Sequence, residues 1–137
     1  REAENEMFPM IKDIGLGFMA YSPLGVGLLS GMYRPGEQPQ EDTLWGSKRK
    51  NDYDKFLGGQ NGLFISKLYE ISKKLDIKMS QLAISWVLSH PEVTLAISGA
   101  DNSDQISEAA DSMTIKLPSE IIKELNDASC KLNHILD

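Results

Sequence analysis

Two segments of the sequence carry residue types that could bind an anionic ligand. Residues 21–27 read Tyr-Ser-Pro-Leu-Gly-Val-Gly, in which the proline fixes a turn and the glycines let the backbone approach a ligand closely. Residues 98–103 read Ser-Gly-Ala-Asp-Asn-Ser and lead into an expected helix, whose first amides and dipole favour a phosphate group. Glycines after strands commonly mark turns alone, so each segment by itself indicates a turn rather than a site. Because two such segments occur, a shared anion-binding site and a pair of simple turns are equally supported.

Both segments follow sequences that are typical of strands. Residues 17–21 form a short, nearly continuous apolar run, which predicts a strand buried on both faces of a parallel sheet. Residues 93–97 are apolar and rich in β-branched residues, which predicts a second strand. Strands that alternate with helices indicate parallel βα units, and ligands bind at the carboxyl ends of such strands.

Helices are expected where apolar residues recur at helical spacing or where a polar cap precedes them. The expected helices cover residues 3–12, 63–75, 80–90, 102–111 and a last segment that includes 121–132. Ser80 and Asn102 are the expected N-caps of the third and fourth helices, and Gln105 makes a capping box with Asn102. Residues 34–62 are rich in Gly, Pro, Gln, Asp and Lys, so a long loop is expected there.

The composition narrows the class of protein. The 137 residues are 41% hydrophobic and 25% charged, which is ordinary for one soluble globular domain. A net charge of −6 and a pI near 4.9 argue against nucleic-acid binding, which needs a basic face. No apolar run reaches the roughly 20 residues of a membrane span. Cys130 is the single cysteine, so we expect no disulfide, no metal site and a cytoplasmic location.

The chain is expected to be one partial domain over residues 1–137. It opens at Arg1 within a charged, helix-like run, which indicates a fragment. Two parallel strands alone would leave sheet edges and apolar surface uncovered. We therefore expect either a larger sheet completed by further sequence, or self-association of this chain.

Three ordered motifs resemble those of the aldo-keto reductase superfamily. Residues 21–31 (YSPLGVGLLSG) resemble its stretch after the seventh barrel strand, 81–88 (QLAISWVL) one of its helices, and 97–108 (ISGADNSDQISE) its segment after the eighth strand. The resemblance implies an α/β fold, the C-terminal part of a (β/α)8 TIM barrel, in which two parallel strands and their helices form an incomplete barrel. It also implies that NADPH or NADH is the cofactor and that aldehydes or ketones are the substrates.

By this resemblance, the two segments contact different halves of the cofactor. The residues implied at the pyrophosphate, or beside it, are Ser22, Pro23, Leu24, Gly25 and Val26. Those implied at the adenosine half are Gly99, Asp101, Gln105 and Glu108, with Asp101 near the ribose 2′ position. Tyr21 occupies the place where an aromatic ring stacks on the nicotinamide, and a buried aromatic at a strand end is the alternative.

Three departures from the family pattern bear on cofactor choice. Asp101 stands where members that use NADP usually have Arg or Ser, Met32 where many have Lys, and Ala109 where Asn is common. A carboxylate repels a 2′-phosphate but accepts hydrogen bonds from ribose hydroxyls, so Asp101 favours NAD over NADP. The alternative is that Asp101 only caps the following helix, while Lys48 or Arg49 neutralises the phosphate.

No catalytic residue is assigned to this chain. The resemblance implies that the catalytic Asp, Tyr, Lys and His lie on the N-terminal half of the barrel, and Tyr33, Tyr53 and Tyr69 do not match the catalytic motif. His90 and His134 are expected to be surface histidines at helix ends, and Lys48-Arg49-Lys50 a solvated charge run. Trp45, Tyr53 and Phe56 are candidates for a wall of the substrate pocket.

The sequence motifs are compatible with two classes of function. One is the cofactor-binding part of an NAD(P)H-dependent oxidoreductase that is inactive without its catalytic half. The other is a non-catalytic, cofactor-sensing regulatory subunit of the potassium-channel β-subunit type. The residues upstream of Arg1 would discriminate, because an intact catalytic Tyr and Lys there favours the enzyme.

Overall fold

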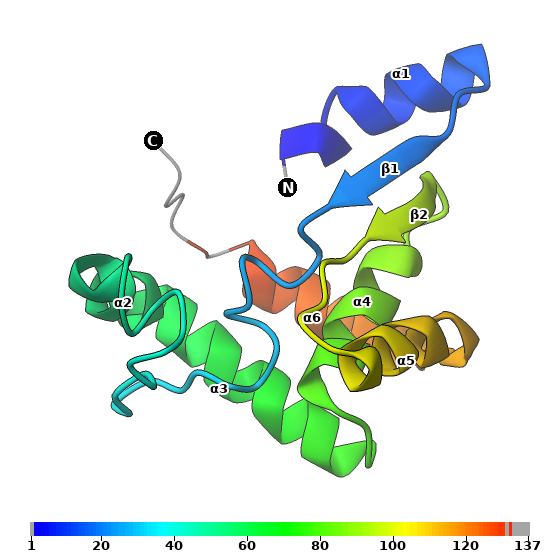
Figure 1. Ribbon diagram of the computed structural model, residues 1–137. Coiled ribbons are helices and arrows are strands. Elements are labelled where there is room, and N and C mark those ends of the chain that lie inside the picture. The colour runs from blue at the N-terminus through cyan, green and yellow to red at the C-terminus, as the bar shows by residue number, and fades with distance from the viewer. Residues whose placement is uncertain (1, 131, 133–137) are drawn as a thin grey trace.

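The computed structural model describes residues 2–130 and residue 132, and Figure 1 shows the arrangement of the elements. In chain order they are a 3-10 helix η1 (Glu2–Glu4), α1 (Met7–Ile14), β1 (Phe18–Tyr21), α2 (Lys50–Leu57), α3 (Gly59–Lys74), α4 (Met79–Leu88), β2 (Val93–Ile97), α5 (Ser103–Asp111), a 3-10 helix η2 (Ser112–Thr114) and α6 (Ser119–Ser129). The chain is α/β with two parallel strands, which is consistent with part of a barrel.

The two strands pair in parallel, and one face of the small sheet is exposed. Met19 pairs with Leu95 and Tyr21 with Ile97, so the four side chains project from the same face. Their exposed fractions are 61%, 41%, 81% and 51%, in that order. The expectation that the first strand is buried on both faces is therefore wrong for this structure. Burial would require another layer over this face, and no other described element covers these side chains.

Residues 34–62 contain more helix than the sequence predicts. The expected loop is wrong from residue 50 onwards, because α2 occupies residues 50–57 and α3 begins at Gly59. Helix α2 buries Tyr53 and Leu57, which are four residues apart and so lie on one face. Asp52 in its first turn and Lys55 in its last turn complement the helix dipole. The surrounding glycines and prolines mask this short pattern in the sequence.

One of the two predicted N-caps is confirmed. The Asn102 side chain accepts a hydrogen bond from the Gln105 amide at 3.0 Å and starts α5. The prediction for Ser80 is wrong, since α4 begins at Met79 and the Gln81 side chain accepts from the Lys78 amide at 3.1 Å. The Ser80 hydroxyl instead donates to Glu108 of α5. A long-range partner thus displaces the local capping role.

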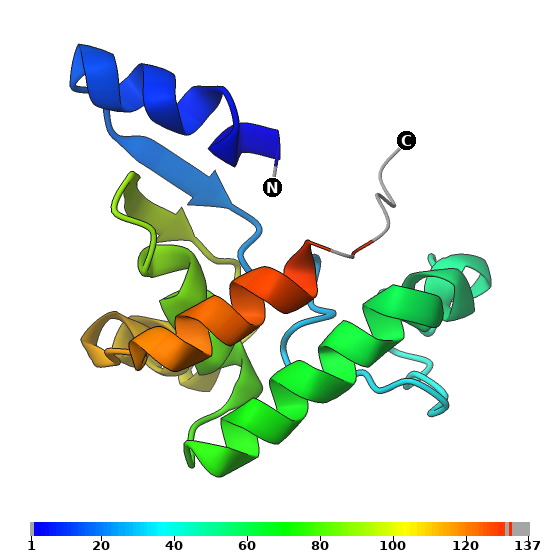
Figure 2. The same cartoon turned by 180° about the vertical axis from the view of Figure 1, so that it is seen from behind.

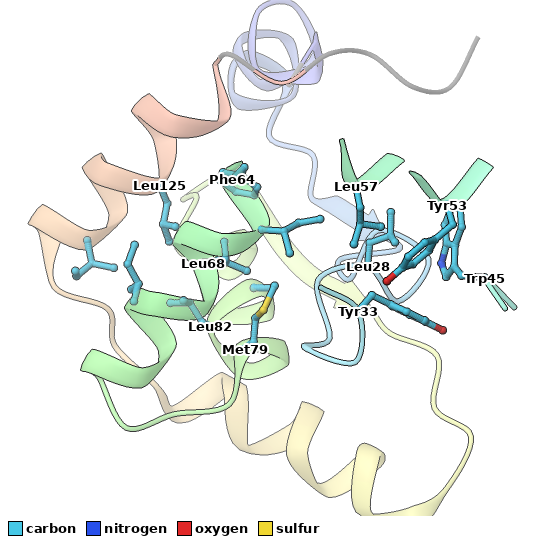
Figure 3. Close-up of a cluster of buried hydrophobic side chains, with 14 residues drawn as sticks. Leu28, Tyr33, Trp45, Tyr53, Leu57, Phe64, Leu68, Met79, Leu82 and Leu125 are labelled. Carbon is cyan, nitrogen blue, oxygen red and sulfur yellow. The ribbon is translucent and has the colours of Figure 1, made fainter. Parts of the chain in front are cut away.

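The core joins three helices to the segment between β1 and α3. Leu68 of α3, Leu82 of α4 and Leu125 of α6 are fully buried together, and Figure 2 shows α6 lying alongside α3. At the other end of the cluster, Figure 3 shows Trp45 and Tyr53 grouped with Leu28, Tyr33 and Leu57.

The predicted aromatic wall of the substrate pocket is not found at a surface. Trp45 is 1% exposed and Tyr53 is 3% exposed, and the rings of Phe56 and Trp45 are 5.0 Å apart. The prediction is therefore wrong for Trp45 and Tyr53, because these rings supply the core that the apolar residues of this region require. Within the described residues, no helix combines the length and apolar character needed to cross a membrane.

Candidate functional site

The turn after β1 has an unusual backbone. Ser22, Gly25, Val26 and Gly27 have φ angles of 50°, 54°, 55° and 88°, in the left-handed region. Glycine adopts this region freely, whereas a β-branched residue such as Val26 is strained there. The Gly25 amide closes the turn by donating to the Ser22 carbonyl at 2.9 Å. Strain of this kind persists only where surrounding structure holds it, and it is concentrated at functional sites.

Hydrogen bonds from both sides hold this turn in place. The Leu28 amide donates to Gly25 O at 3.2 Å, and the Ser30 hydroxyl donates to Gly27 O at 2.6 Å. The Trp45 indole N–H donates to Val26 O at 2.9 Å. Together these bonds fix the carbonyls of Gly25, Val26 and Gly27, and that of Val26 is directed at the buried Trp45.

Several amides of the turn are available to a ligand. The N–H groups of Leu24, Val26 and Gly27 donate to no other residue in the described part of the chain. Tyr21, which precedes them, is 81% exposed, so the alternative of a buried strand-end aromatic does not hold in this structure. Successive free amides next to left-handed residues form a concavity suited to an anion. Pro23 is buried and anchors the base of the turn.

The second segment begins at the same edge of the sheet. Because Tyr21 and Ile97 are register partners in a parallel pair, Ser22 and Ser98 both follow at the carboxyl ends. Gly99 is exposed, and a Cβ built on it would meet nothing within 4 Å, so there is open space beside this residue. The structure therefore brings the two predicted segments together.

The helix that follows presents its N-terminus and an acidic side chain. The Gln105 side chain accepts from the Asp101 amide at 2.8 Å, so Gln105 orders the segment before α5. The Asp101 side chain is exposed, as is that of Asp104 in the first helical turn. Free first-turn amides attract an anion, whereas these two carboxylates oppose it. This end of the site therefore suits a hydroxyl-bearing group better than a second phosphate.

Glu108 has partners that the sequence did not reveal. Its carboxylate accepts from Lys78 Nζ at 2.5 Å and from the Ser80 hydroxyl. The hydrogen bond and the charge of Glu108 raise the pKa of Lys78 above its usual value. These contacts tie α5 to the start of α4. A carboxylate has about four acceptor positions, so Glu108 has the capacity to accept a further hydrogen bond from a ligand.

The basic run of the long segment is only partly solvated. Lys48 and Lys50 are exposed, as expected. Arg49 is half-buried, with its guanidinium carbon 5.5 Å from the centre of the Trp45 ring. Since Trp45 is bonded to Val26, Arg49 is connected to the turn after β1 through this ring.

His90 is not the surface residue that the sequence predicts. Its side chain is 18% exposed, and its Nδ1 lies 3.2 Å from Trp86 O. Its Nε2 lies 3.7 Å from Glu4, and its ring contacts Phe8 and Trp86. The contact with Glu4 joins residues that are far apart in sequence, which is why spacing gave no signal. His134 lies outside the described residues.

The remaining tyrosines belong to the core or pack against it, and Tyr33 lies next to the turn after β1, since a Cβ built on Gly27 would be 3.5 Å from its ring. Tyr33 and Tyr53 pack edge to face at 5.9 Å, and Arg34 lies 3.4 Å above the Tyr69 ring. One hollow lies between α3 and α6, and another lies beside Tyr53 and Gly62. Neither hollow includes a residue predicted to contact the cofactor, although Tyr53 lines the second. Within the described residues, no group of His, Cys, Asp and Glu is arranged to hold a metal ion.

Comparison with known proteins gives a consistent result. The Aldo/keto reductase family matches residues 1–129. The chain is 32% identical to "Uncharacterized oxidoreductase YrpG" of Bacillus subtilis, over 93% of this chain and 36% of that protein. It is 33% identical to "Versiconal hemiacetal acetate reductase" of Aspergillus parasiticus, over 93% of this chain and 36% of that protein. It is also 33% identical to "Probable voltage-gated potassium channel subunit beta" of Oryza sativa, over 78% of this chain and 33% of that protein. The chain thus spans about a third of the length of these relatives.

Proposed function

Because the chain belongs to the aldo/keto reductase family, we propose that it is the C-terminal, cofactor-binding part of an NAD(P)H-dependent oxidoreductase that reduces aldehydes or ketones. The observation that carries the proposal is the meeting of two predicted cofactor segments at one sheet edge, where Tyr21 pairs with Ile97. In parallel α/β folds, ligands bind at this edge.

The residues present fit a dinucleotide. Free amides of the turn suit the pyrophosphate, and the exposed Tyr21 ring offers a flat surface to the nicotinamide. The open space beside Gly99 leaves room for the adenosine half, with Asp101 and Gln105 at the following helix start. Ser22, Pro23, Leu24, Gly25 and Val26 form the pyrophosphate side of this proposed site, and Glu108 borders the adenosine side.

This chain's contribution to the reaction is binding and orientation. When bound, the nicotinamide supplies a hydride to the carbonyl carbon of the substrate. Tyr21 holds the plane of the ring, and the turn amides fix the phosphates, which limits where the reactive end lies. We assign the proton that completes the alcohol to residues outside this chain, because Tyr33, Tyr53 and Tyr69 do not match the family's catalytic motif and His90 packs against Phe8 and Trp86. The family places those acid–base groups on the N-terminal half of the barrel.

The acidic end of the site favours NADH over NADPH. Asp101 is exposed at the proposed ribose position, and Asp104 adds a second negative charge nearby. Lys78, a basic residue whose charge interacts with that of Asp104, is already bound by Glu108 at 2.5 Å. A ribose hydroxyl can donate to Asp101, whereas a 2′-phosphate would be repelled by it.

A regulatory subunit that senses the cofactor is the second candidate. The similarity to the rice protein named as a probable channel subunit, at 33% identity, favours it. Both candidates require cofactor binding at the same edge, but only the enzyme turns over a carbonyl substrate at a rate typical of enzymes. Steady-state kinetics therefore separates the two.

The test uses the full polypeptide that contains this segment. NADH and NADPH are titrated by calorimetry, and aldehyde reduction is then followed by loss of nicotinamide absorbance. Gly25→Ala is compared with Gly36→Ala, because both glycines have positive φ angles, of 54° and 83°, and neither would produce a steric clash. Both substitutions strain the backbone, but only Gly25→Ala should weaken cofactor binding. No binding of either nucleotide by the unchanged protein would refute the proposal.

A further inference from the structure

We infer that Trp45 is a positioning residue for the cofactor, acting through the carbonyl of Val26. The inference rests on the proposed function, since it assigns a role at the same site. It starts from one contact: the indole N–H of Trp45 donates to Val26 O at 2.9 Å, across 19 positions of sequence. Figure 3 shows Trp45 among the labelled side chains at one end of the core.

Val26 is the residue at which such a contact matters. Its φ of 55° is disfavoured for a β-branched side chain, and the side chain itself is exposed, so packing of that side chain does not hold the conformation. The hydrogen bond to its carbonyl fixes the peptide group that joins Val26 to Gly27. The N–H of this same peptide group belongs to Gly27, which donates to no other described residue. Trp45 and the turn's own hydrogen bond from Leu28 to Gly25 O therefore set the direction of an amide that has no acceptor among the described residues.

Trp45 is itself held rigidly. It is 1% exposed, its ring lies 5.0 Å from that of Phe56, and Arg49 lies over its face. The next residue, Gly46, packs so closely against the Gln40 carbonyl that a Cβ there would lie 1.8 Å from the oxygen. Thr43 ties the same segment together by donating to Gln40 O at 2.6 Å and accepting from the Gly46 amide at 3.1 Å.

Residues 40–46 therefore support the site indirectly. The family resemblance places none of them on the cofactor, yet Trp45 presents one hydrogen-bond donor to the strained turn. Fixing a binding group in advance lowers the ordering cost on association, which increases affinity without any new contact to the ligand. Loss of the donor is expected to raise the dissociation constant of the dinucleotide about tenfold, the equivalent of one hydrogen bond.

The chain supplies a matched control in its other tryptophan. Trp86 also donates its indole N–H over 2.9 Å, to Asn126 Oδ1, and it lies on α4 away from the turn. Trp45→Phe and Trp86→Phe each remove one indole hydrogen bond of the same length and one ring of the same size. Both should lower the unfolding midpoint, Trp45→Phe by more because Trp45 is buried whereas Trp86 is half-buried. Only Trp45→Phe should weaken cofactor binding.

The experiment is carried out on the full polypeptide with NADH as the probe. Dissociation constants come from calorimetry, and steady-state kinetics should show a raised KM for NADH at unchanged kcat for Trp45→Phe. If Trp45→Phe does not fold, 3-benzothienylalanine at position 45 keeps the shape of the ring and removes only the donor. Equal NADH affinity in the Trp45 variant and the unchanged protein would overturn this inference alone. Equal weakening of NADH binding by Trp86→Phe would also overturn the role of Trp45. Failure of the unchanged protein to bind NADH would refute both this role and the proposed function.

Discussion

Tyr21 and Ile97 are partners in a parallel register at the carboxyl ends of β1 and β2. This one pairing fixes where the two following segments begin, and it places the turn at residues 22–27 beside the start of the 98–103 segment. In Figure 1 the two chain segments leave the sheet on the same side. Neither segment forms a site alone. The strand pairing places the free amides of the turn beside the segment that leads into α5.

Replacing Asp101 with arginine should reverse cofactor preference in the full polypeptide. A ribose hydroxyl that donates to the carboxylate stabilises NADH by roughly 1.5–3 kcal/mol, and a guanidinium would bind the 2′-phosphate instead. Dissociation constants for NADH and NADPH in both proteins measure the effect. Asp104→Arg makes the same change of charge one turn away and should shift the preference far less. Unchanged NADPH affinity in Asp101→Arg would show that Asp101 does not contact the ribose.

The 137-residue chain by itself should reduce no carbonyl compound with either nucleotide. A missing general acid alone costs about 10²–10⁴-fold in rate, and the substrate pocket would be incomplete as well. The assay follows nicotinamide absorbance with simple aldehydes at high protein concentration. Turnover above trace level would show that this chain holds its own acid–base group.

The isolated chain should self-associate through its exposed sheet face. Met19, Tyr21, Leu95 and Ile97 present contiguous apolar surface beside open strand edges. Sedimentation velocity should detect dimers or larger species, and Leu95→Lys should shift them towards monomer. Leu63→Lys is the control, because Leu63 is also exposed but lies on α3. A compact monomer with cooperative unfolding would contradict this prediction.

Glu108→Ala should destabilise the protein even without cofactor. It leaves the buried Ser80 hydroxyl without its acceptor, at a cost of about 1–3 kcal/mol, and it releases Lys78. Urea denaturation of the full polypeptide measures the free energy of unfolding. Asp127→Ala removes an exposed pair with Lys123 and should change that free energy little. Equal effects of the two substitutions would mean that the contact between α4 and α5 is unimportant for stability.

Tyr53 should make stability depend on pH in the alkaline range. Burial raises its pKa above 10.0. The folded state thus holds the phenol proton more tightly than the unfolded chain, so this contribution is complete below pH 10 and is lost as pH rises through the folded pKa. Tyr53→Phe loses a weak 3.4 Å hydrogen bond, so about 0.5–1 kcal/mol of stability at pH 8 is expected to disappear.

The measurement for Tyr53 compares denaturation at pH 8 and at pH 10.5. The stability deficit of Tyr53→Phe should shrink at the higher pH, because the unchanged protein then pays to keep its phenol neutral. A deficit that is constant with pH would show that Tyr53 does not titrate differently in the folded and unfolded states.

The local signals in the sequence were sufficient for much of the fold. The apolar run at 93–97 gave the bounds of β2, and Asn102 gave the start of α5, because strand propensity and capping act over a few residues. The order of strands and helices also gave the parallel pairing of the sheet. The family followed from three motifs whose residues are close in sequence, and the match over residues 1–129 confirms it.

What the sequence could not supply was the set of side-chain contacts between distant residues. Ser80 has the chemistry of an N-cap, yet its hydroxyl is bound by Glu108, 28 positions away. Trp45 was predicted to line a substrate pocket, yet it is buried and its indole N–H donates to the Val26 carbonyl. Spacing along a chain determines which face of a helix or strand a residue occupies, and the sequence decided those faces. Only the tertiary structure decides which faces and ends meet, because a polar or aromatic side chain goes to whichever partner the packed fold brings within reach.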